Sequence, residues 1–181
     1  YSSAASDVYK RQGFEASFIP FIKKIDDFHA KVNSNFNKNV SFIENGDSIK
    51  TLQELLVKFK GKPILVDFWF STCGPCVSNF QRFGKDLEKF TVQNDITLLC
   101  VSIDKEQEQW HTAIKYYKIG GKHIKACQSL HEDIYKTHNV HIFPHYMLVG
   151  SDGKILINRL KDLSEHDNFY NQIYDALAKE E

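Results

Sequence analysis

Short apolar runs alternate with stripes of apolar residues at helical spacing, and this alternation predicts the order of the elements. The first stripe predicts a helix within residues 14–32, in which Pro20 fits only near the start. The Asn-rich stretch NSNFNKN ends this helix. Residues 41–49 favour a short hairpin around Asn45-Gly46, a dipeptide typical of two-residue turns.

The middle of the chain predicts two buried strands separated by a helix. A capping box, Thr51-Leu52-Gln53-Glu54, opens a short helix that Gly61-Lys62-Pro63 ends. The continuous run ILVDFWF, residues 64–70, then predicts a strand buried on both faces, and ITLLCVSI, residues 96–103, predicts another. A helical stripe ending at Phe90 separates the two strands.

The rest of the chain completes an α/β pattern. It predicts a helix at 110–117, a strand at 123–127, a helix at 130–138, a hairpin of residues 146–149 and 154–159, and a last helix capped by Ser164. The resulting order, β-α-β-α-β-α-β-β-α, indicates a central mixed sheet flanked by helices.

Composition narrows the class of protein. The chain has 181 residues, which fits one domain with an appendage, and 23 basic residues balance 23 acidic ones. This balance gives no electrostatic case for nucleic acid or an anionic membrane. No apolar run approaches the roughly 20 residues of a membrane span.

The domain organisation follows from these patterns. The stretch YSSAASDVYKRQ is small, polar and without period, so we expect residues 1–12 to be a non-native or disordered lead-in. We expect residues 13–39 to form an N-terminal helical extension and residues 40–181 to form the folded domain. Because the first residue is Tyr1 rather than Met, we expect the true N-terminus and any targeting signal to be missing.

Cys73 and Cys76 form a CGPC motif directly after the first buried strand. Such a pair can be a structural disulfide, half of a metal site or a redox pair, and its place between a strand and a helix favours redox chemistry. A thiol at a helix N-terminus faces unpaired N–H groups and the positive end of the dipole, so we expect the pKa of Cys73 to lie below the free value of about 8.5. Cys73 should be the more exposed, attacking thiol, and Cys76 the more buried, resolving thiol.

Three neighbours support the motif in this interpretation. Pro75 suits the first helical turn, Gly74 leaves the approach to sulfur unobstructed, and Trp69 lends apolar support. No second CxxC or CxxH is present, so no metal ligand set is predicted.

Asp67 interrupts the apolar run ILVDFWF, where a carboxylate is costly. Burial should raise its pKa, and a carboxyl below the cysteines could take the proton of Cys76 during resolution. The alternative is a solvated, inert Asp at an edge or bulge. Further along, Pro144 precedes the apolar run HYMLV, and a cis peptide between Phe143 and Pro144 would let a proline stand at a strand entrance. The backbone exposed there could pair with an extended substrate segment.

The remaining cysteines and histidines define competing hypotheses. Cys100 lies within a predicted buried strand and is expected to be an inert core thiol, and Cys127 is expected to have no role. His138, His141 and His145 bracket Pro144, so a copper or zinc carrier built from the cysteine pair and these histidines is the alternative function. A peroxidase on the same fold is a third interpretation, although paired cysteines favour dithiol exchange.

The stretch ILVDFWFSTCGPC resembles the active-site segment of the thioredoxin superfamily. The flanking GKPILVDFW, VSIDKEQEQW and NVHIFPHYMLVGSDGKI are similar to the TlpA/ResA-like group of thiol–disulfide oxidoreductases, many of which come from bacterial envelopes. The resemblance spans about residues 40–177 and implies a thioredoxin fold with an inserted β-α element at residues 104–127.

The resemblance also implies roles for individual residues. It makes Cys73 the nucleophile, Cys76 the resolving thiol, Asp67 the buried acid and Pro144 a cis-proline facing the pair. Two positions depart from the pattern: Thr72 stands where the family usually has Trp, which alters the surface near the sulfur, and many envelope members lack the acid found at Asp67.

These observations predict a protein thiol–disulfide oxidoreductase without a bound cofactor. CGPC is the motif of thioredoxin itself, whose potential of about −270 mV favours reduction of partner proteins. Phe143, Pro144 and Thr72 are the expected substrate-binding residues. The expected partners are a disulfide- or dithiol-bearing protein and a separate redox donor, and the expected location is the cell envelope or periplasm, with the cytoplasm as the alternative.

Overall fold

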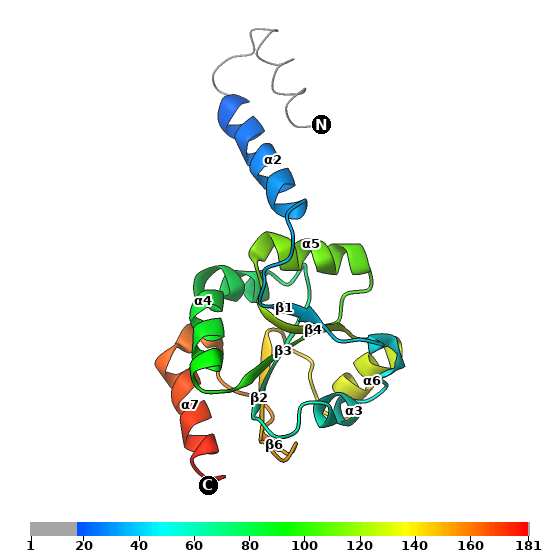
Figure 1. Ribbon diagram of the computed structural model, residues 1–181, viewed down its shortest axis with the longest axis vertical. Coiled ribbons are helices and arrows are strands. Elements are labelled where there is room, and N and C mark those ends of the chain that lie inside the picture. The colour runs from blue at the N-terminus through cyan, green and yellow to red at the C-terminus, as the bar shows by residue number, and fades with distance from the viewer. Residues whose placement is uncertain (1–17, 181) are drawn as a thin grey trace.

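The computed structural model describes residues 18–180, and a six-stranded mixed sheet forms its centre (Figure 1). The strands lie in the order β1 (Val40–Phe42), β4 (Gly121–Lys125), β3 (Thr97–Ser102), β2 (Ile64–Trp69), β5 (His145–Val149) and β6 (Ile155–Ile157). The first four are mutually parallel, whereas β5 is antiparallel to both β2 and β6. The predicted fold class, an α/β fold with a central mixed sheet, is confirmed.

Helices cover both faces of the sheet and complete two apolar cores. On one face, Ile64, Val66 and Phe68 of β2 pack with α3 (Leu52–Val57) and α6 (Gln128–Lys136). On the other face, Leu65 and Trp69 pack with α4 (Gly74–Gln93), α5 (Gln107–Tyr117) and α7 (Asp167–Leu177). Because side chains alternate along a strand, this division follows from the sequence of β2 itself.

The predicted capping box starts α3 as expected. The Thr51 hydroxyl accepts a hydrogen bond from the Glu54 N–H at 3.2 Å, and the Glu54 carboxylate accepts one from the Thr51 N–H at 3.3 Å. The two bonds satisfy backbone donors that the first helical turn leaves without partners. The helix then buries Leu52, Leu55 and Leu56 completely.

The predicted hairpin at residues 41–49 is wrong. Residues 40–42 form β1, which pairs in parallel with β4 far along the chain, and the following turn leads into a short 3-10 helix, η2 (Gly46–Ser48). Asn45 does adopt the left-handed conformation that the Asn-Gly dipeptide suggested, with φ of 53°. The local turn signal was therefore valid, but long-range pairing decided the partner of β1.

The predicted cap of the last helix is also wrong. Ser164 lies inside a second 3-10 helix, η3 (Leu163–Glu165), and α7 begins only at Asp167. The capping acceptor is the carboxylate of Asp162, which accepts from the Ser164 N–H at 2.9 Å. This carboxylate caps η3 rather than α7, whose N-cap residue, His166, makes no side-chain capping bond.

Residues 104–127, expected to hold an inserted element, contain α5 followed by β4. This helix–strand unit adds β4 between β1 and β3. No helix within residues 18–180 combines the length and apolar content that crossing a bilayer requires.

Helix α2 (Ile19–Val32) confirms the predicted N-terminal helix, and Pro20 lies in its first turn. The helix extends away from the sheet and approaches the domain only near α5 (Figure 1). There the Phe28 ring lies 5.4 Å from the Tyr116 ring, and the Lys31 ammonium lies over the same ring. The predicted lead-in of residues 1–12 and the start of the predicted helix at Phe14 lie outside the described part of the chain.

Deleting residues 1–32 tests whether this extension contributes to the stability of the domain. No α2 side chain is buried, so we expect the deletion to lower the free energy of unfolding by less than about 1 kcal/mol. Phe169→Ala in α7 provides the contrast, because that ring is fully buried and its truncation should cost roughly 3–5 kcal/mol. Urea denaturation measures both, and a loss from the deletion as large as that of Phe169→Ala would contradict this view.

Candidate functional site

Cys73 and Cys76 are joined by a disulfide at the junction between β2 and α4, with their Cα atoms 5.3 Å apart. Cys73 is the N-cap residue of α4, and its Sγ accepts a hydrogen bond from the Cys76 N–H at 3.2 Å. Pro75 lies in the first turn, where its missing N–H costs nothing. A negative charge on Cys73 would therefore face the helix N-terminus and a donor already directed at its sulfur.

The two cysteines differ less in exposure than expected. Cys73 is 4% exposed and Cys76 1%, so the predicted order is correct but both sulfur-bearing side chains are buried. Thr72, Gly74 and Pro75 form the exposed surface of the motif. A Cβ added to Gly74 would meet no atom within 4 Å, so the approach over this residue is open.

The structure brings Phe143 and Trp69 to the cysteine pair. The Phe143–Pro144 peptide is cis, as predicted. Phe143 packs on the apolar cluster that contains both cysteines, and its ring lies edge-on to Phe70 at 5.5 Å. Trp69 is fully buried in the same cluster. Trp69 of β2 and Phe143 before β5 therefore share one apolar cluster with the disulfide.

Asp67 is buried in the sheet on the face that α4 covers. Along β2 it shares this face with Leu65 and Trp69, because every second side chain of a strand points the same way, and it is only 1% exposed. Neither carboxyl oxygen has a hydrogen-bond partner in the described part of the chain. Burial raises the pKa of Asp67 well above its usual value, and the nearby Asp162 carboxylate raises it further. Asp67 is therefore not the solvated residue at an edge or bulge that the alternative expected.

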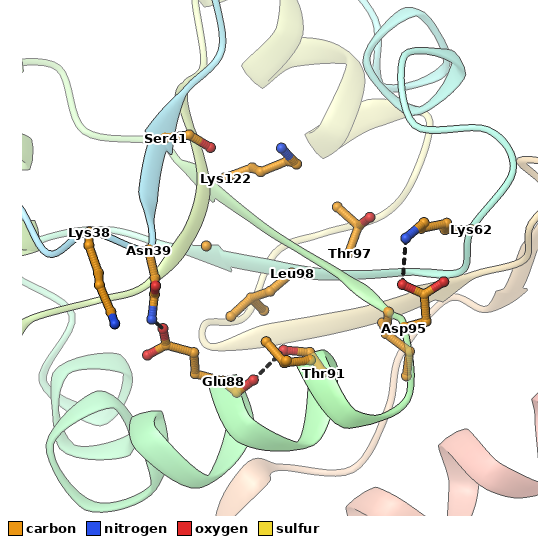
Figure 2. Close-up of a pocket in the computed structure, with 13 residues that line it drawn as sticks. Lys38, Asn39, Ser41, Lys62, Glu88, Thr91, Asp95, Thr97, Leu98 and Lys122 are labelled. Atoms are coloured by element: carbon orange, nitrogen blue, oxygen red, sulfur yellow. Dashed lines mark hydrogen bonds and ion pairs between the residues drawn. The ribbon is translucent and has the colours of Figure 1, made fainter.

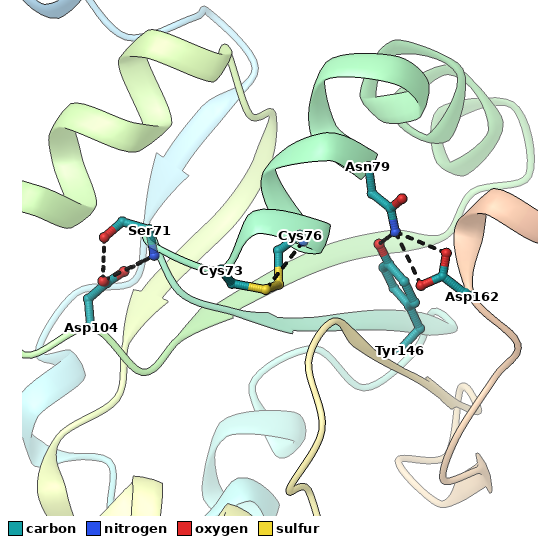
Figure 3. The surroundings of a disulfide bond; sticks show 7 residues. All are labelled: Ser71, Cys73, Cys76, Asn79, Asp104, Tyr146 and Asp162. Atoms are coloured by element: carbon teal, nitrogen blue, oxygen red, sulfur yellow. Dashed lines mark hydrogen bonds between the residues drawn. A yellow bond between two sulfur atoms is a disulfide. The ribbon is translucent and has the colours of Figure 1, made fainter.

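A polar cluster beyond Cys76 was missed in the sequence. One turn after this cysteine, the buried Asn79 amide donates hydrogen bonds to the Tyr146 hydroxyl at 3.2 Å and to the Asp162 carboxylate at 3.3 and 3.4 Å (Figure 3). Burial raises the pKa of Tyr146, and the Asp67 carboxylate raises it further. The only sequence signal was an Asn within the apolar stripe of α4.

A second polar cluster, also missed, fixes the loop before Cys73. The nearly buried Asp104 carboxylate accepts hydrogen bonds from the Ser71 N–H at 2.9 and 3.1 Å, from the Ser71 hydroxyl at 2.6 Å and from the Ser102 hydroxyl at 2.7 Å (Figure 3). These residues stand at the carboxyl ends of the neighbouring strands β2 and β3. That shared position could have indicated their proximity.

The histidines expected near the motif have other partners. His145 forms a 2.7 Å hydrogen bond with the Asn158 carbonyl, His138 lies 3.6 Å from the Asp133 carboxylate, and His141 packs on Tyr135. Within residues 18–180, no three His, Cys, Asp or Glu side chains are grouped to hold a metal ion. The arrangement gives the metal-carrier hypothesis no support.

The other two cysteines are free, and Cys100 belongs to the same apolar cluster as the motif pair. Cys100 is fully buried on β3, beside Asp67 in the register, and burial raises the pKa of its thiol well above the usual value. Cys127 is half-buried, and its thiol donates to the Ile49 carbonyl at 3.3 Å.

A surface cleft of about 460 Å³ lies elsewhere, between the end of α4 and the strands β1, β3 and β4 (Figure 2). Lys62 pairs with Asp95 there, and the Asn39 amide donates to the Glu88 carboxylate. No cysteine lines this cleft. It therefore offers no counterpart to the chemistry of the disulfide.

Comparison with known proteins gives consistent results. A family model described as thioredoxin-like matches residues 61–155. The thioredoxin domain of a thiol-disulfide oxidoreductase from Bacteroides vulgatus is 31% identical, with a TM-score of 0.56 over 66% of this chain and 82% of that one. A thiol:disulfide interchange protein from Bacteroides sp. is 30% identical, with a TM-score of 0.55 over 65% of this chain and 74% of that one.

A curated plant protein shows a shorter similarity. The chloroplastic thioredoxin-like protein CITRX2 of Nicotiana benthamiana is 33% identical over 61 residues, which are 34% of this chain and 32% of that protein. The chain thus spans about a third of the length of the curated relatives it matches.

Replacing Asp67 with Asn should stabilise the disulfide form in a pH-dependent way. Because the folded state raises the pKa of Asp67, ionisation above the ordinary value of 3.8 costs folding free energy that a neutral amide avoids. We expect equal stability of the two proteins below about pH 3.5, and a gain of roughly 1–3 kcal/mol for Asp67→Asn once the pH exceeds the raised pKa. Denaturation curves across pH measure this, and Asp86→Asn, an exposed acid on α4, is the control. A gain that does not change with pH would contradict the assignment.

Replacing Asp104 with Ala should loosen the loop before Cys73. The change leaves the Ser71 N–H without the carboxylate that accepts it, at a cost of roughly 1–3 kcal/mol. Denaturation measures this cost, and faster hydrogen exchange at the Ser71 amide would locate it. Glu106→Ala, on the exposed segment that follows, is the control, and equal stability of the two variants would contradict the anchoring role.

Proposed function

Because the chain belongs to the thioredoxin-like family, we propose that it is a thiol–disulfide oxidoreductase that reduces disulfides in partner proteins through Cys73 and Cys76. The observation that carries this proposal is the disulfide at the start of α4, with the helix N-terminus on one side and the cis Phe143–Pro144 peptide nearby. Two sulfurs that can bond and separate at this position can pass an electron pair to a substrate disulfide.

In the first proposed step, the Cys73 thiolate attacks one sulfur of the substrate disulfide. A bond forms between Cys73 and that sulfur, the substrate S–S bond breaks, and the other substrate sulfur leaves as a thiolate that takes a proton from water. The Cys76 N–H, directed at the Cys73 sulfur, and the helix dipole stabilise the attacking thiolate.

In the second step, Cys76 loses its proton to Asp67 and attacks the Cys73 sulfur. The bond from Cys73 to the substrate breaks, the Cys73–Cys76 disulfide forms, and the second substrate thiolate is released and takes a proton from water. The pair has then lost two electrons and the substrate has gained them. The buried, unpartnered carboxyl of Asp67 supports its role as proton acceptor, because its raised pKa brings it closer to that of a thiol.

Substrate binding is proposed for the surface around the motif. Thr72 is exposed beside Cys73, and Phe143 and Pro144 are half-buried across from it. The exposed Ile142 side chain extends the apolar part of this surface. An extended segment of a partner protein could lie here, with its backbone beside the cis peptide and its disulfide over Cys73.

The proposed partners are a disulfide-bearing protein and a separate donor that returns electrons to the pair, and the two sulfurs need no bound cofactor. Disulfides persist in oxidising compartments. This fact and the resemblance to envelope oxidoreductases support a location in the cell envelope or periplasm.

Serine substitutions at the two cysteines test the order of the steps. We expect Cys73→Ser to abolish reduction of a protein disulfide such as that of insulin, because the attacking sulfur is lost. Cys76→Ser should instead accumulate a mixed disulfide between Cys73 and the substrate, visible by mass spectrometry. Cys127→Ser, which leaves the pair intact, is the matched control and should retain full activity.

Two results would contradict the proposal. Cys73→Ser that still reduces insulin at the wild-type rate would show that the pair is not the catalyst. A measured potential near −120 mV, rather than near −270 mV, would make the protein an oxidant instead of a reductant.

A further inference from the structure

Asn79 joins the helix that carries the cysteines to two other parts of the fold. It stands on α4 three residues after Cys76, and its side-chain amide contacts the Tyr146 hydroxyl of β5 and the Asp162 carboxylate in the loop before η3 (Figure 3). Asn79 is 5% exposed and Tyr146 is 2% exposed, so these contacts are shielded from water. The position of Asp162 relative to α4 is therefore fixed from inside the protein.

Asp162 is held from a second side as well. Its Oδ1 accepts hydrogen bonds from the Ser164 N–H at 2.9 Å and from the Ser164 hydroxyl at 2.5 Å. With Asn79 on one side and Ser164 on the other, the carboxylate has little freedom to turn toward solvent. It is only partly exposed, and no Lys or Arg is paired with it within residues 18–180.

The same cluster borders Asp67. Tyr146 is the cross-strand neighbour of Asp67 on β5, and Cys100 is its neighbour on β3. The ionisable groups beside this carboxyl are therefore Tyr146 and Cys100 in the sheet, together with Asp162. All of them are acids, and among the described residues no cation acts on Asp67. Of these groups, the Asp162 carboxylate is the one whose charge raises the pKa of Asp67.

We propose that Asn79 is a positioning residue that holds the Asp162 carboxylate beside the Asp67 pocket, so that Asp162 governs how readily Asp67 takes the proton of Cys76. This proposal deepens, and rests on, the proposed disulfide exchange. A fixed negative charge disfavours a second negative charge nearby, and low dielectric strengthens the effect. The Asp162 charge thus makes Asp67, once ionised, a stronger proton acceptor, but confines its ionisation to higher pH, in the same direction as burial.

The decisive variant is Asp162→Asn, which removes the charge but keeps an oxygen for Ser164. The direct readout is the carboxyl carbon NMR signal of Asp67 followed across pH, identified by its loss in Asp67→Asn. We expect the Asp67 midpoint to move to lower pH in Asp162→Asn. Asp86→Asn, the same charge change at an exposed position of α4, should leave it in place.

Asn79→Leu tests the positioning role, because it replaces the amide with an apolar side chain of similar size. We expect the Asp67 midpoint to move in the same direction as in Asp162→Asn, since the carboxylate is then free to turn to solvent. The double variant Asn79→Leu/Asp162→Asn should show little further movement of the Asp67 midpoint, because both changes remove the same interaction.

The pH profile of insulin reduction gives the functional readout. A lower Asp67 midpoint leaves more of this base ionised at mildly acidic pH, so the acid limb of the profile should shift to lower pH in Asp162→Asn, with a severalfold higher rate at pH 6. Asp86→Asn should reproduce the wild-type profile.

Each outcome decides the proposal. An Asp67 midpoint that is the same in Asp162→Asn and Asp86→Asn overturns it, and so does a moved midpoint with an unchanged rate profile. The proposal is supported if the Asp67 midpoint and the acid limb of the rate profile both move to lower pH in Asp162→Asn and in Asn79→Leu. If the wild-type protein reduces no disulfide at any pH, the proposed function fails, while the NMR midpoint still reports separately whether Asp162 acts on Asp67.

Discussion

The burial of β2 on both faces is the constraint on which the site depends. All six of its residues are buried, and alternation along the strand directs Asp67 to the face that α4 covers. A carboxyl at that position cannot reach water, and the fold supplies it with neither a hydrogen bond nor a cation within residues 18–180. The helix that carries the cysteine pair therefore covers a carboxyl whose pKa is raised by burial.

Polar clusters hold the start of α4 from both sides. Before Cys73, the Asp104 carboxylate fixes the Ser71 backbone to the end of β3, and after Cys76, Asn79 fixes the helix to β5 and to the loop before η3. Between them, Gly74 and Pro75 face the surface. The disulfide can thus open and close at a short turn whose two ends are anchored, which preserves the geometry that exchange requires.

Features encoded within a few residues could be predicted from the sequence, and features that depend on distant contacts could not. The buried strand, the CGPC turn at a helix start and the cis peptide before Pro144 each depend on a local pattern, and the structure contains all three. The clusters join residues 33 and 83 positions apart, so only the folded chain reveals them. The hairpin expected at Asn45 failed for the same reason, because β4 supplied a better partner for β1 than the adjacent chain.

The electrostatics of the pocket also bear on the resolving step of the proposed reaction. Before resolution, Cys76 holds its proton and Asp67 must carry a buried negative charge to accept it. When Asp67 takes that proton and the disulfide forms, the carboxyl becomes neutral, which is the form that burial and the Asp162 carboxylate both favour. Closing the disulfide therefore removes the buried negative charge of the Asp67 carboxylate. In the proposed exchange, the pocket therefore assists the resolving step that releases the substrate, whereas the potentials of the two dithiol pairs set the overall direction.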